Sequence, residues 1–397
     1  MVEGPVFEGL KVVEFAHVVA GPVAGGLLAD LGATVVHVEA PGTGDPTRQL
    51  SLAKGGKHVW WSAIGRNKRS VTLDLRSPEG QRVARRLAAW SDVVITNMRV
   101  ETLERWGLDW ASLHAVNDRL VMLQISANGA ASTLRNEPGF GKVGEARSGA
   151  LHLTGHADGP PLAVGYSQAD AVTGLMGAFA ISAALTRRHE PDFHGEWIDL
   201  ALFESLYRLI DWQVILYDQL GFVPTRAGNQ VEAVPSALIN TYRTSDGAWI
   251  IVTSGTPKSV RNIAALVGLP VDEYATMDQL VRGRDRLDKA LAAWIAGHTA
   301  AQTLAEMTRQ EVIASRIYSV ADIVDDPTYL ERDDVISVTD PTLGTVRMHG
   351  VVPRLANRPG RVWRTGPDLG QDNDYVYREL VGLTAAELDR LRAAGTV

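Results

Sequence analysis

The chain alternates strand-like and helix-like segments from residue 10 onward, and this alternation limits its fold more than any other feature of the sequence. Leu10–Ala16 and Ala33–Glu39 have the apolar, β-branched composition of buried strands, and Gly21–Leu31 between them has the pattern of a helix. Three later segments are further strand candidates: Val71–Leu75, Asp92–Asn97 and Leu120–Ser126. Strands that alternate with helices predict an α/β fold, with a mainly parallel sheet and helices on both faces.

Ligands of such a sheet bind beyond the carboxyl ends of its strands. The first βα turn partly matches a dinucleotide site, because an acidic residue follows it by about 20 residues. However, residues 20–26 lack the G-x-G-x-x-G spacing, and Pro22 has no N–H to donate to a phosphate. These departures argue against nicotinamide binding, and because the match is partial, an NAD(P)-dependent oxidoreductase is kept only as an alternative function. The residues at the strand ends are His17–Gly21, Glu39–Pro41, Arg76 and Asn97–Arg99.

The second half of the chain changes in character. Residues 198–221 have a long helical pattern with charged residues inside it, which predicts a helix that is buried or lies at a subunit interface. The strand candidate Trp249–Ser254 and several short helices then indicate a smaller unit that extends to Asp325. In the tail, Gly344–His349 is a strand candidate, and the capping box Thr384–Glu387 predicts the start of a last helix.

The composition excludes several classes of function. The chain has 39 Lys and Arg against 46 Asp and Glu, and a net charge of −7 argues against a nucleic-acid partner. It has no cysteine, which excludes disulfides, thiolate metal sites and a cysteine nucleophile. The N-terminal residues do not resemble a signal peptide, and the longest uncharged run, 171–186, is shorter than the about 18 residues of a membrane span. We therefore expect a cytoplasmic protein with no membrane partner.

The carboxylate that precedes this uncharged run is the first candidate for chemistry. Asp170 is predicted at the N-cap of a core helix over residues 171–186, which is followed by Arg187 and Arg188. In the structural explanation, Asp170 accepts hydrogen bonds from the free N–H groups of the first turn. In the functional explanation, an ionised carboxylate beside small residues acts as a nucleophile. Position alone favours the structural explanation.

Other polar and aromatic residues point less clearly to chemistry. His17 follows the first predicted strand, but no second histidine lies at ligand spacing from it, so no metal site is predicted. Arg66–Arg69 is a basic cluster before a strand, and it is either a solvated turn or a contact for a phosphorylated ligand. Trp60 and Trp61 are either core residues or a lid over a pocket.

Six blocks between residues 12 and 161 occur together in one order: Val12–Pro22, Leu28–Ala33, Val38–Arg48, Asn67–Leu75, Leu103–Gly107 and Gly155–Pro161. These blocks resemble the class III CoA-transferase family, which includes formyl-CoA and carnitine CoA-transferases. In that family the nucleophile is an aspartate a few residues after the Gly-Pro-Pro block. Asp170 occupies this position, so the resemblance favours the functional explanation.

The resemblance also implies an architecture. Members of the family are homodimers of two interlocked, ring-like subunits, each with a Rossmann-like large domain and a smaller α/β domain. The large domain is formed by both ends of the chain, which here corresponds to residues 1–221 and 326–397. The small domain with its connectors corresponds to residues 222–325.

A CoA thioester is implied as a co-substrate, with no tightly bound cofactor. The arginines at the matching positions suit the phosphates of CoA, and the apolar residues suit its adenine and pantetheine parts. One departure is Ala40, which stands where some members have an arginine. The implied CoA-binding residues are Val19, Ala20, Leu73, Arg76, Asn97, Arg99, Arg105, Gly139 and Phe140.

The predicted reaction is the exchange of CoA between an acyl-CoA donor, such as succinyl-CoA, and a small carboxylic acid through an aspartyl-CoA thioester. The alternative within the superfamily is an α-methylacyl-CoA racemase, which uses a histidine and an aspartate to move an α-proton. The turn that carries this aspartate reads Pro138–Gly141 here, and Gly141 supplies no carboxylate. Glu145 lies one helical turn further on, and we take it, with His17, as a possible auxiliary residue.

Overall fold

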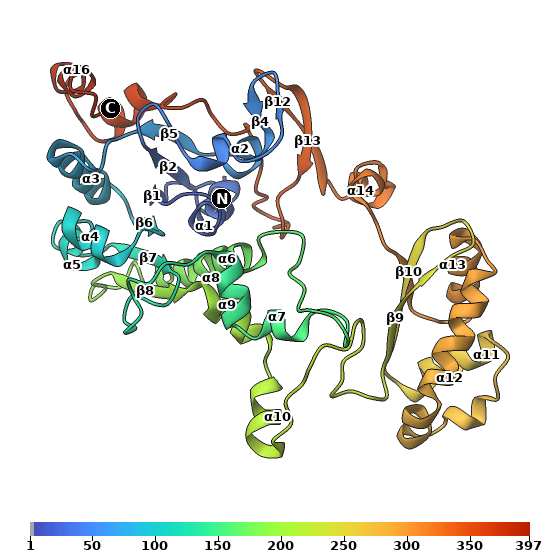
Figure 1. The fold of residues 1–397 in the computed structure, drawn as a ribbon. Coiled ribbons are helices and arrows are strands. Elements are labelled where there is room, and N and C mark those ends of the chain that lie inside the picture. The colour runs from blue at the N-terminus through green and yellow to red at the C-terminus, as the bar shows by residue number, and fades with distance from the viewer. Residues whose placement is uncertain (1–3) are drawn as a thin grey trace. The chain divides into compact units, whose positions relative to one another are not determined.

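The computed structural model describes residues 4–397, which form two compact units (Figure 1). The first unit contains the described residues up to Ala150, then Ala163–Asp211 and Pro327–Val397. The second unit contains Leu151–Leu162 and Trp212–Asp326. The second unit therefore takes over at Trp212, whereas the sequence placed this boundary at Phe222. The short segment Leu151–Leu162, which lies earlier in the chain, also belongs to the second unit.

A six-stranded parallel sheet forms the centre of the first unit, as the alternation of strands and helices predicts. Numbered along the chain, its strands have the order 3-2-1-4-5-6 of doubly wound nucleotide-binding folds, whose ligands bind where the order reverses. The reversal falls between β1 and β6, where Val12 pairs with Val93. In spatial order the strands are β5 (Arg69–Thr72), β2 (Thr34–Glu39), β1 (Lys11–Phe15), β6 (Val93–Thr96), β7 (Val121–Ser126) and β8 (Glu196–Ala201).

Helices cover both faces of this sheet (Figure 1). On one face, α1 (Ala20–Asp30) and α8 (Gln168–Leu185) contribute to a core that includes Leu28, Ile95 and Ile181. These two helices approach closely because Gly174 has no side chain, and a Cβ there would lie 2.7 Å from the Ala20 carbonyl oxygen. The other face is covered by α3 (Pro78–Trp90), α4 (Val100–Trp106), α5 (Trp110–His114), the π-helical turn η3 (Tyr375–Leu380) and α16 (Ala385–Ala393).

The second unit is built on an antiparallel sheet of β11 (Ala314–Arg316), β10 (Trp249–Ser254) and β9 (Leu238–Arg243). Its core joins this sheet to α11 (Pro257–Leu266), α12 (Met277–Ala296) and α13 (Ala300–Arg309). The remaining elements of the chain are η1 (Pro46–Arg48), β3 (Ala53–Lys54), β4 (Lys57–His58), α2 (Val59–Ile64), α6 (Gly141–Arg147), α7 (Ala150–Leu153), α9 (Leu202–Leu209), α10 (Gln213–Leu220), η2 (Val271–Tyr274), α14 (Val320–Asp325), α15 (Pro327–Glu331), β12 (Val335–Asp340) and β13 (Gly344–His349).

The prediction of one long helix over residues 198–221 is wrong. This segment begins in β8, which pairs with β7, and continues as α9 and α10. The Glu204 side chain accepts a 2.7 Å hydrogen bond from the Ala201 N–H and thereby fixes the start of α9. Asp211, with a φ of 47°, interrupts the helical path before α10. Glu196–Ala201 does not alternate between polar and apolar residues, because an acidic residue comes only at every third position, so the strand pattern was absent here.

The central helix α8 has the length and apolar composition of a membrane span, with 18 residues and a hydropathy of 1.2. It is longer than the uncharged run because it begins at Gln168. Its residues Ile181 and Leu185 belong to the core between α1 and the sheet, and a Cβ at Gly177 would lie 2.5 Å from Leu123. We therefore describe α8 as the core helix of the first unit.

Candidate active site

A cavity of about 300 Å³ lies at the carboxyl ends of β1, β6 and β7, where the strand order reverses. The first turn of α8 and the start of α6 complete its wall. The cavity brings together seven of the residues that the sequence nominated, from four separate parts of the chain. These are His17, Val19, Ala20, Asn97, Gly139, Phe140 and Asp170.

The loops after β1 and β6 are tied to each other at the edge of this cavity. The His17 N–H donates to Asn97 Oδ1 at 2.9 Å, and Asn97 Nδ2 donates to the His17 carbonyl oxygen at 2.7 Å. Both ends of the Asn97 amide are thus used to hold the His17 backbone. The next residue, Val18, has a φ of 66°, which is rare for a β-branched side chain and marks a constrained backbone.

Asp170 lies in the first turn of α8 and is not its N-cap, so the predicted position within the helix is wrong. The helix begins at Gln168, and Ser167 is the N-cap residue. A serine is a favoured N-cap and an acidic residue is favoured in the first turn, so the local sequence Ser167–Asp170 explains the earlier start. Among residues 4–397, none donates a side-chain hydrogen bond to the Asp170 carboxylate, which faces the cavity half-buried.

Gly141 makes room for the Asp170 carboxylate. A Cβ built on Gly141 would collide with Asp170 Oδ2, although the backbone of Gly141 is compatible with any residue. A carboxylate side chain at position 141 would therefore compete with Asp170 for the same space. Gly141 stands where the racemase pattern has its acid, and its lack of a side chain allows Asp170 to occupy its present position.

The environment of Asp170 weakens its acidity. Burial raises the pKa of Asp170, the nearby Glu145 carboxylate raises it further, and Lys142 opposes them, with a result of about 6. Glu145 has only 2% of its side chain exposed and pairs with Lys142 Nζ at 2.8 Å. Lys142 Nζ also donates to the carbonyl oxygens of Val164 and Tyr166, which precede α8. The pair of Lys142 and Glu145 therefore connects α6 to the segment that carries Asp170.

A cluster of ionised side chains lies behind the loops of the cavity, and sequence reasoning missed it. We call Glu14, His37, Asp45 and Lys68 the buried ion cluster, because each has no exposed surface. His37 Nδ1 lies 2.6 Å from Glu14 Oε2, and Lys68 Nζ lies 2.9 Å from Glu14 Oε1. On the other side of the His37 ring, Nε2 lies 3.5 Å from Asp45 Oδ2. The available signal was an ionisable residue next to a Val-Val pair in each of two buried strands, Glu14 in β1 and His37 in β2.

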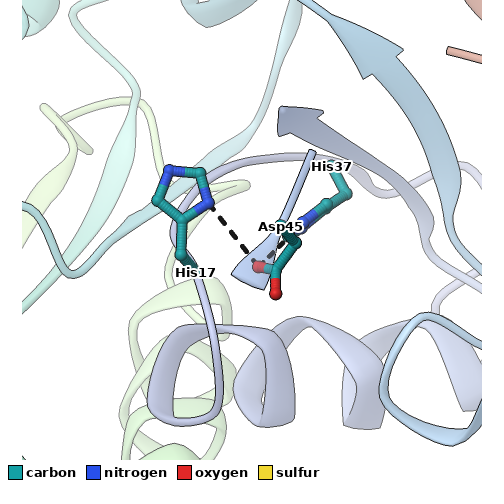
Figure 2. Close-up of side chains that lie close together, drawn as sticks. All are labelled: His17, His37 and Asp45. Atoms are coloured by element: carbon teal, nitrogen blue, oxygen red, sulfur yellow. Dashed lines mark ion pairs between the residues drawn. The ribbon is translucent and has the colours of Figure 1, made fainter. Parts of the chain in front are cut away.

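Asp45 connects the buried ion cluster to the cavity (Figure 2). Its Oδ2 accepts the Val18 N–H at 3.0 Å and lies 3.6 Å from His17 Nδ1. Burial opposes charge on His37, but Asp45 and Glu14 outweigh it and raise the pKa of His37 to about 9. Burial likewise opposes charge on Asp45, but hydrogen bonding by His17 and His37 holds the pKa of Asp45 well below its usual range.

His17, His37 and Asp45 offer nitrogen and oxygen atoms within 4.8 Å of one another, which raises the question of a metal ion. An ion there would have to displace the His37 proton. Lys68 already supplies a positive charge to the same cluster, and the two carboxylates balance Lys68 and protonated His37. A divalent cation would leave an excess of positive charge in a site without solvent. We therefore read the three residues as an ion-pair network and not as metal ligands.

The other nominated residues do not line the cavity. Leu73 is buried in the core on the α3 side of the sheet, whereas Arg76, Arg99 and Arg105 are exposed. Their contact with CoA stays a prediction. Of the two tryptophans, Trp60 lines the cavity. Trp61 is buried, and its Nε1 donates to the Pro367 carbonyl oxygen at 2.7 Å, so it is a core residue.

Comparisons with known proteins agree over the length of the chain. A family model described as CoA-transferase family III matches residues 7–373. The chain is 37% identical over 391 residues to the succinyl-CoA–D-citramalate CoA-transferase of Chloroflexus aurantiacus, covering 97% of this chain and 96% of that protein. It is 31% identical to the succinate–glutarate CoA-transferase of Agrobacterium fabrum, covering 95% and 96%. A solved CAIB/BAIF family protein from Brucella suis has a TM-score of 0.84 and 31% identity, covering 95% of this chain and 100% of that one.

The charge arrangement around Asp170 predicts opposite effects for two substitutions in α6. Glu145→Gln removes the negative charge that helps to raise the pKa of Asp170, so this pKa should fall below about 6. Lys142→Gln removes the opposing positive charge, so the pKa should rise. NMR titration of ¹³Cγ-labelled aspartate, with the Asp170 signal assigned by its loss in Asp170→Asn, measures both. A shift in the same direction for the two variants would contradict the assignment of charges.

Proposed function

The chain belongs to CoA-transferase family III and is a CoA-transferase; we propose that it moves CoA from succinyl-CoA to a small carboxylic acid, with Asp170 as the nucleophile. The observation that carries the proposal is the carboxylate of Asp170, which faces the cavity without a side-chain hydrogen bond and has a pKa of about 6. A carboxyl group with this pKa is about nine-tenths ionised at pH 7. It is also a stronger base, and hence a better nucleophile, than an ordinary aspartate.

The proposed reaction consists of four acyl-transfer steps at one carboxylate. Asp170 attacks the thioester carbonyl of the donor, the C–S bond breaks, and a mixed anhydride and CoA thiolate form. The thiolate then attacks the Asp170 carbonyl carbon, which releases the donor acid and leaves an aspartyl-CoA thioester. The acceptor carboxylate attacks this thioester, and the expelled thiolate attacks the acceptor carbonyl of the new anhydride. The product thioester leaves, and Asp170 returns as a carboxylate.

The names of the relatives support the choice of substrates. The two CoA-transferases described above are named for succinyl-CoA with D-citramalate and for succinate with glutarate, all of them short dicarboxylates or their CoA thioesters. A cavity of about 300 Å³ suits an acyl group of that size at Asp170. The CoA moiety itself, as a co-substrate, would extend from Val19 and Ala20 toward the exposed guanidinium groups of Arg76, Arg99 and Arg105. The cytoplasmic location predicted from the sequence is part of this proposal.

We further propose that the active form is a homodimer. None of the α10 residues is buried, although the helix carries Ile215, Tyr217 and Leu220, which are 64%, 63% and 73% exposed. On α8, Leu175 and Phe179 are 57% and 70% exposed. Apolar side chains so exposed are typical of interaction surfaces, and the family resemblance supports a second copy of the chain as the partner.

The dimer predicts the mass of the protein in solution. Sedimentation equilibrium should give twice the 42.9 kDa of one chain. Ile215→Asp replaces an exposed apolar side chain of α10 with a charge and should weaken the dimer, whereas the conservative substitution Ile215→Leu at the same position should not. A monomeric wild-type protein that is fully active would overturn the proposal.

The nucleophile predicts a covalent adduct at a single residue. Incubation with succinyl-CoA followed by hydroxylamine should convert the Asp170 carboxyl to a hydroxamate, which peptide mass spectrometry locates. Asp170→Asn should stay folded, because the carboxylate makes no side-chain hydrogen bond, and should lose transfer by at least about a thousandfold. An active enzyme in which Asp170 remains unmodified, while another carboxyl is labelled, would show that the nucleophile lies elsewhere.

The steric role of Gly141 predicts that one methyl group disables the site. Gly141→Ala should displace the Asp170 carboxylate and lower kcat/KM for transfer by about a hundredfold, because small misplacements of reacting groups are costly. The matched control is Gly165→Ala, since Gly165 lies five residues before Asp170 and a Cβ there meets nothing within 4 Å. If Gly141→Ala were as active as Gly165→Ala, the position of the Asp170 carboxylate next to Gly141 would not be the one from which it reacts.

Isotope exchange separates transfer from the isomerase alternative. A racemase needs a base and an acid on opposite faces of the α-carbon, and Gly141 leaves one of them without its family group. In deuterated water, a 2-methylacyl-CoA should therefore gain negligible α-deuterium, while CoA passes measurably to an added acid. Fast deuterium uptake without transfer would instead favour the isomerase, with Lys142, Glu145 or His17 as its base.

A further inference from the structure

His17 has the geometry of an acid–base group on the wall of the cavity that contains Asp170. Its side chain is 30% exposed, but its Nδ1 atom is buried and faces Asp45 Oδ2 at 3.6 Å. Figure 2 shows that the second ring nitrogen points away from Asp45. One nitrogen of the imidazole is therefore directed at a buried carboxylate, and the other is left for a group in the cavity.

Asp45 is fixed on its other sides. It accepts the Val18 N–H through Oδ2 and the Thr47 N–H, at 2.7 Å, through Oδ1. The His37 ring lies behind it in the buried ion cluster. Asp45 therefore has no freedom to turn away from His17. A carboxylate held against Nδ1 keeps the proton on that nitrogen, orients the ring and stabilises the imidazolium that forms when Nε2 takes up a proton.

The proposed transfer reaction has a use for such a group. In two of its four steps the C–S bond breaks and the electron pair stays on the CoA sulfur. Alkyl thiols such as that of cysteine have a pKa of about 8.5, so a bare thiolate leaves the tetrahedral intermediate less readily than the Asp170 carboxylate, whose pKa is about 6. A proton donor near the sulfur lowers this barrier, and the same group must take the proton back before the thiol attacks the anhydride.

We propose that His17 is this acid–base catalyst and that Asp45 is its positioning residue. The inference rests on the proposed transferase function. When Asp170 attacks the thioester, protonated His17 gives its Nε2 proton to the departing sulfur, which yields neutral CoA thiol, the anhydride and neutral His17. When the thiol attacks the anhydride, Nε2 removes the same proton as the new C–S bond forms and the carboxylate of the released acid departs. No further reactant is consumed.

The test compares two donors whose leaving groups differ in their need for a proton. Single-turnover thiol release is measured with succinyl-CoA and with the succinyl thioester of 4-nitrothiophenol, whose thiolate is stable without protonation. His17→Asn keeps a donor toward Asp45 but has no proton to transfer. It should slow release from succinyl-CoA by about 10² or more, and release of the aryl thiolate by less than about tenfold. His17→Gln should behave in the same way.

Each outcome decides between defined alternatives. Equal losses with the two donors would show that His17 only shapes the cavity, and no loss with succinyl-CoA would show that it is not involved; either overturns the inference. The proposed function is tested separately by Asp170→Asn, which should abolish release from both donors. If the wild-type protein releases no thiol from either donor, the transferase proposal itself fails.

Asp45 is tested by the same pair of donors. Asp45→Asn keeps an oxygen for the Val18 N–H but removes the charge that faces His17. If Asp45 positions His17, thiol release by this variant should slow more with succinyl-CoA than with the aryl thioester. Circular dichroism should show that the variant is folded. A folded Asp45→Asn variant with equal losses for the two donors would limit Asp45 to support of the loop.

Discussion

The buried ion cluster is the interaction on which the architecture of the site depends. A charge without a partner in a protein interior costs several kcal/mol, so each segment that supplies one of these ions is held to the others. Glu14 and His37 come from the neighbouring strands β1 and β2, Asp45 from the loop that follows β2, and Lys68 from the turn before β5. Lys68 Nζ also donates to the Pro22 carbonyl oxygen at 2.6 Å, which fixes the first turn of α1. The loops that line the cavity are thereby held without a disulfide or a bound ligand.

Small residues then decide where the Asp170 carboxylate lies. Gly174 lets α8 approach α1, and Gly139, whose Cβ would lie 2.6 Å from the Ala127 Cβ, lets the start of α6 approach the end of β7. Gly141 finally leaves the space that Asp170 occupies. These glycines leave the space that the Asp170 carboxylate occupies. Within residues 4–397, no side chain donates a hydrogen bond to it, so its oxygens stay available to a substrate. Glu145 then raises the pKa of Asp170 and Lys142 lowers it, both through their charge and without a hydrogen bond to the Asp170 carboxylate.

The sequence was sufficient for the parallel sheet, because five of its six strands are short, almost wholly buried segments that are rich in Val and other β-formers. It failed for β8, an edge strand with exposed and half-buried residues whose composition also suits a helix. The resemblance to a family identified Asp170, but local rules placed it three positions too early in its helix, because the stronger N-cap signal is Ser167. His37 was not found, and Lys68 was noted only within the basic cluster Arg66–Arg69, because the partners of both residues are distant in the sequence.

The strand order of a dinucleotide-binding fold is retained here, yet the helix start that binds phosphate in such folds is put to another use. A phosphate there needs free N–H groups and space in front of the first turn of the helix. In this chain Pro22 lacks the N–H, and α8 packs against the first turn of α1, because Gly174 leaves room for the Ala20 carbonyl oxygen. Asp170, one turn earlier in α8, brings a covalently attached carboxylate to the crevice where the fold would otherwise receive a dissociable anion. The same crevice thus suits the proposed acyl transfer at a fixed residue, and the physical reason lies in the glycines that let α8 pack beside α1.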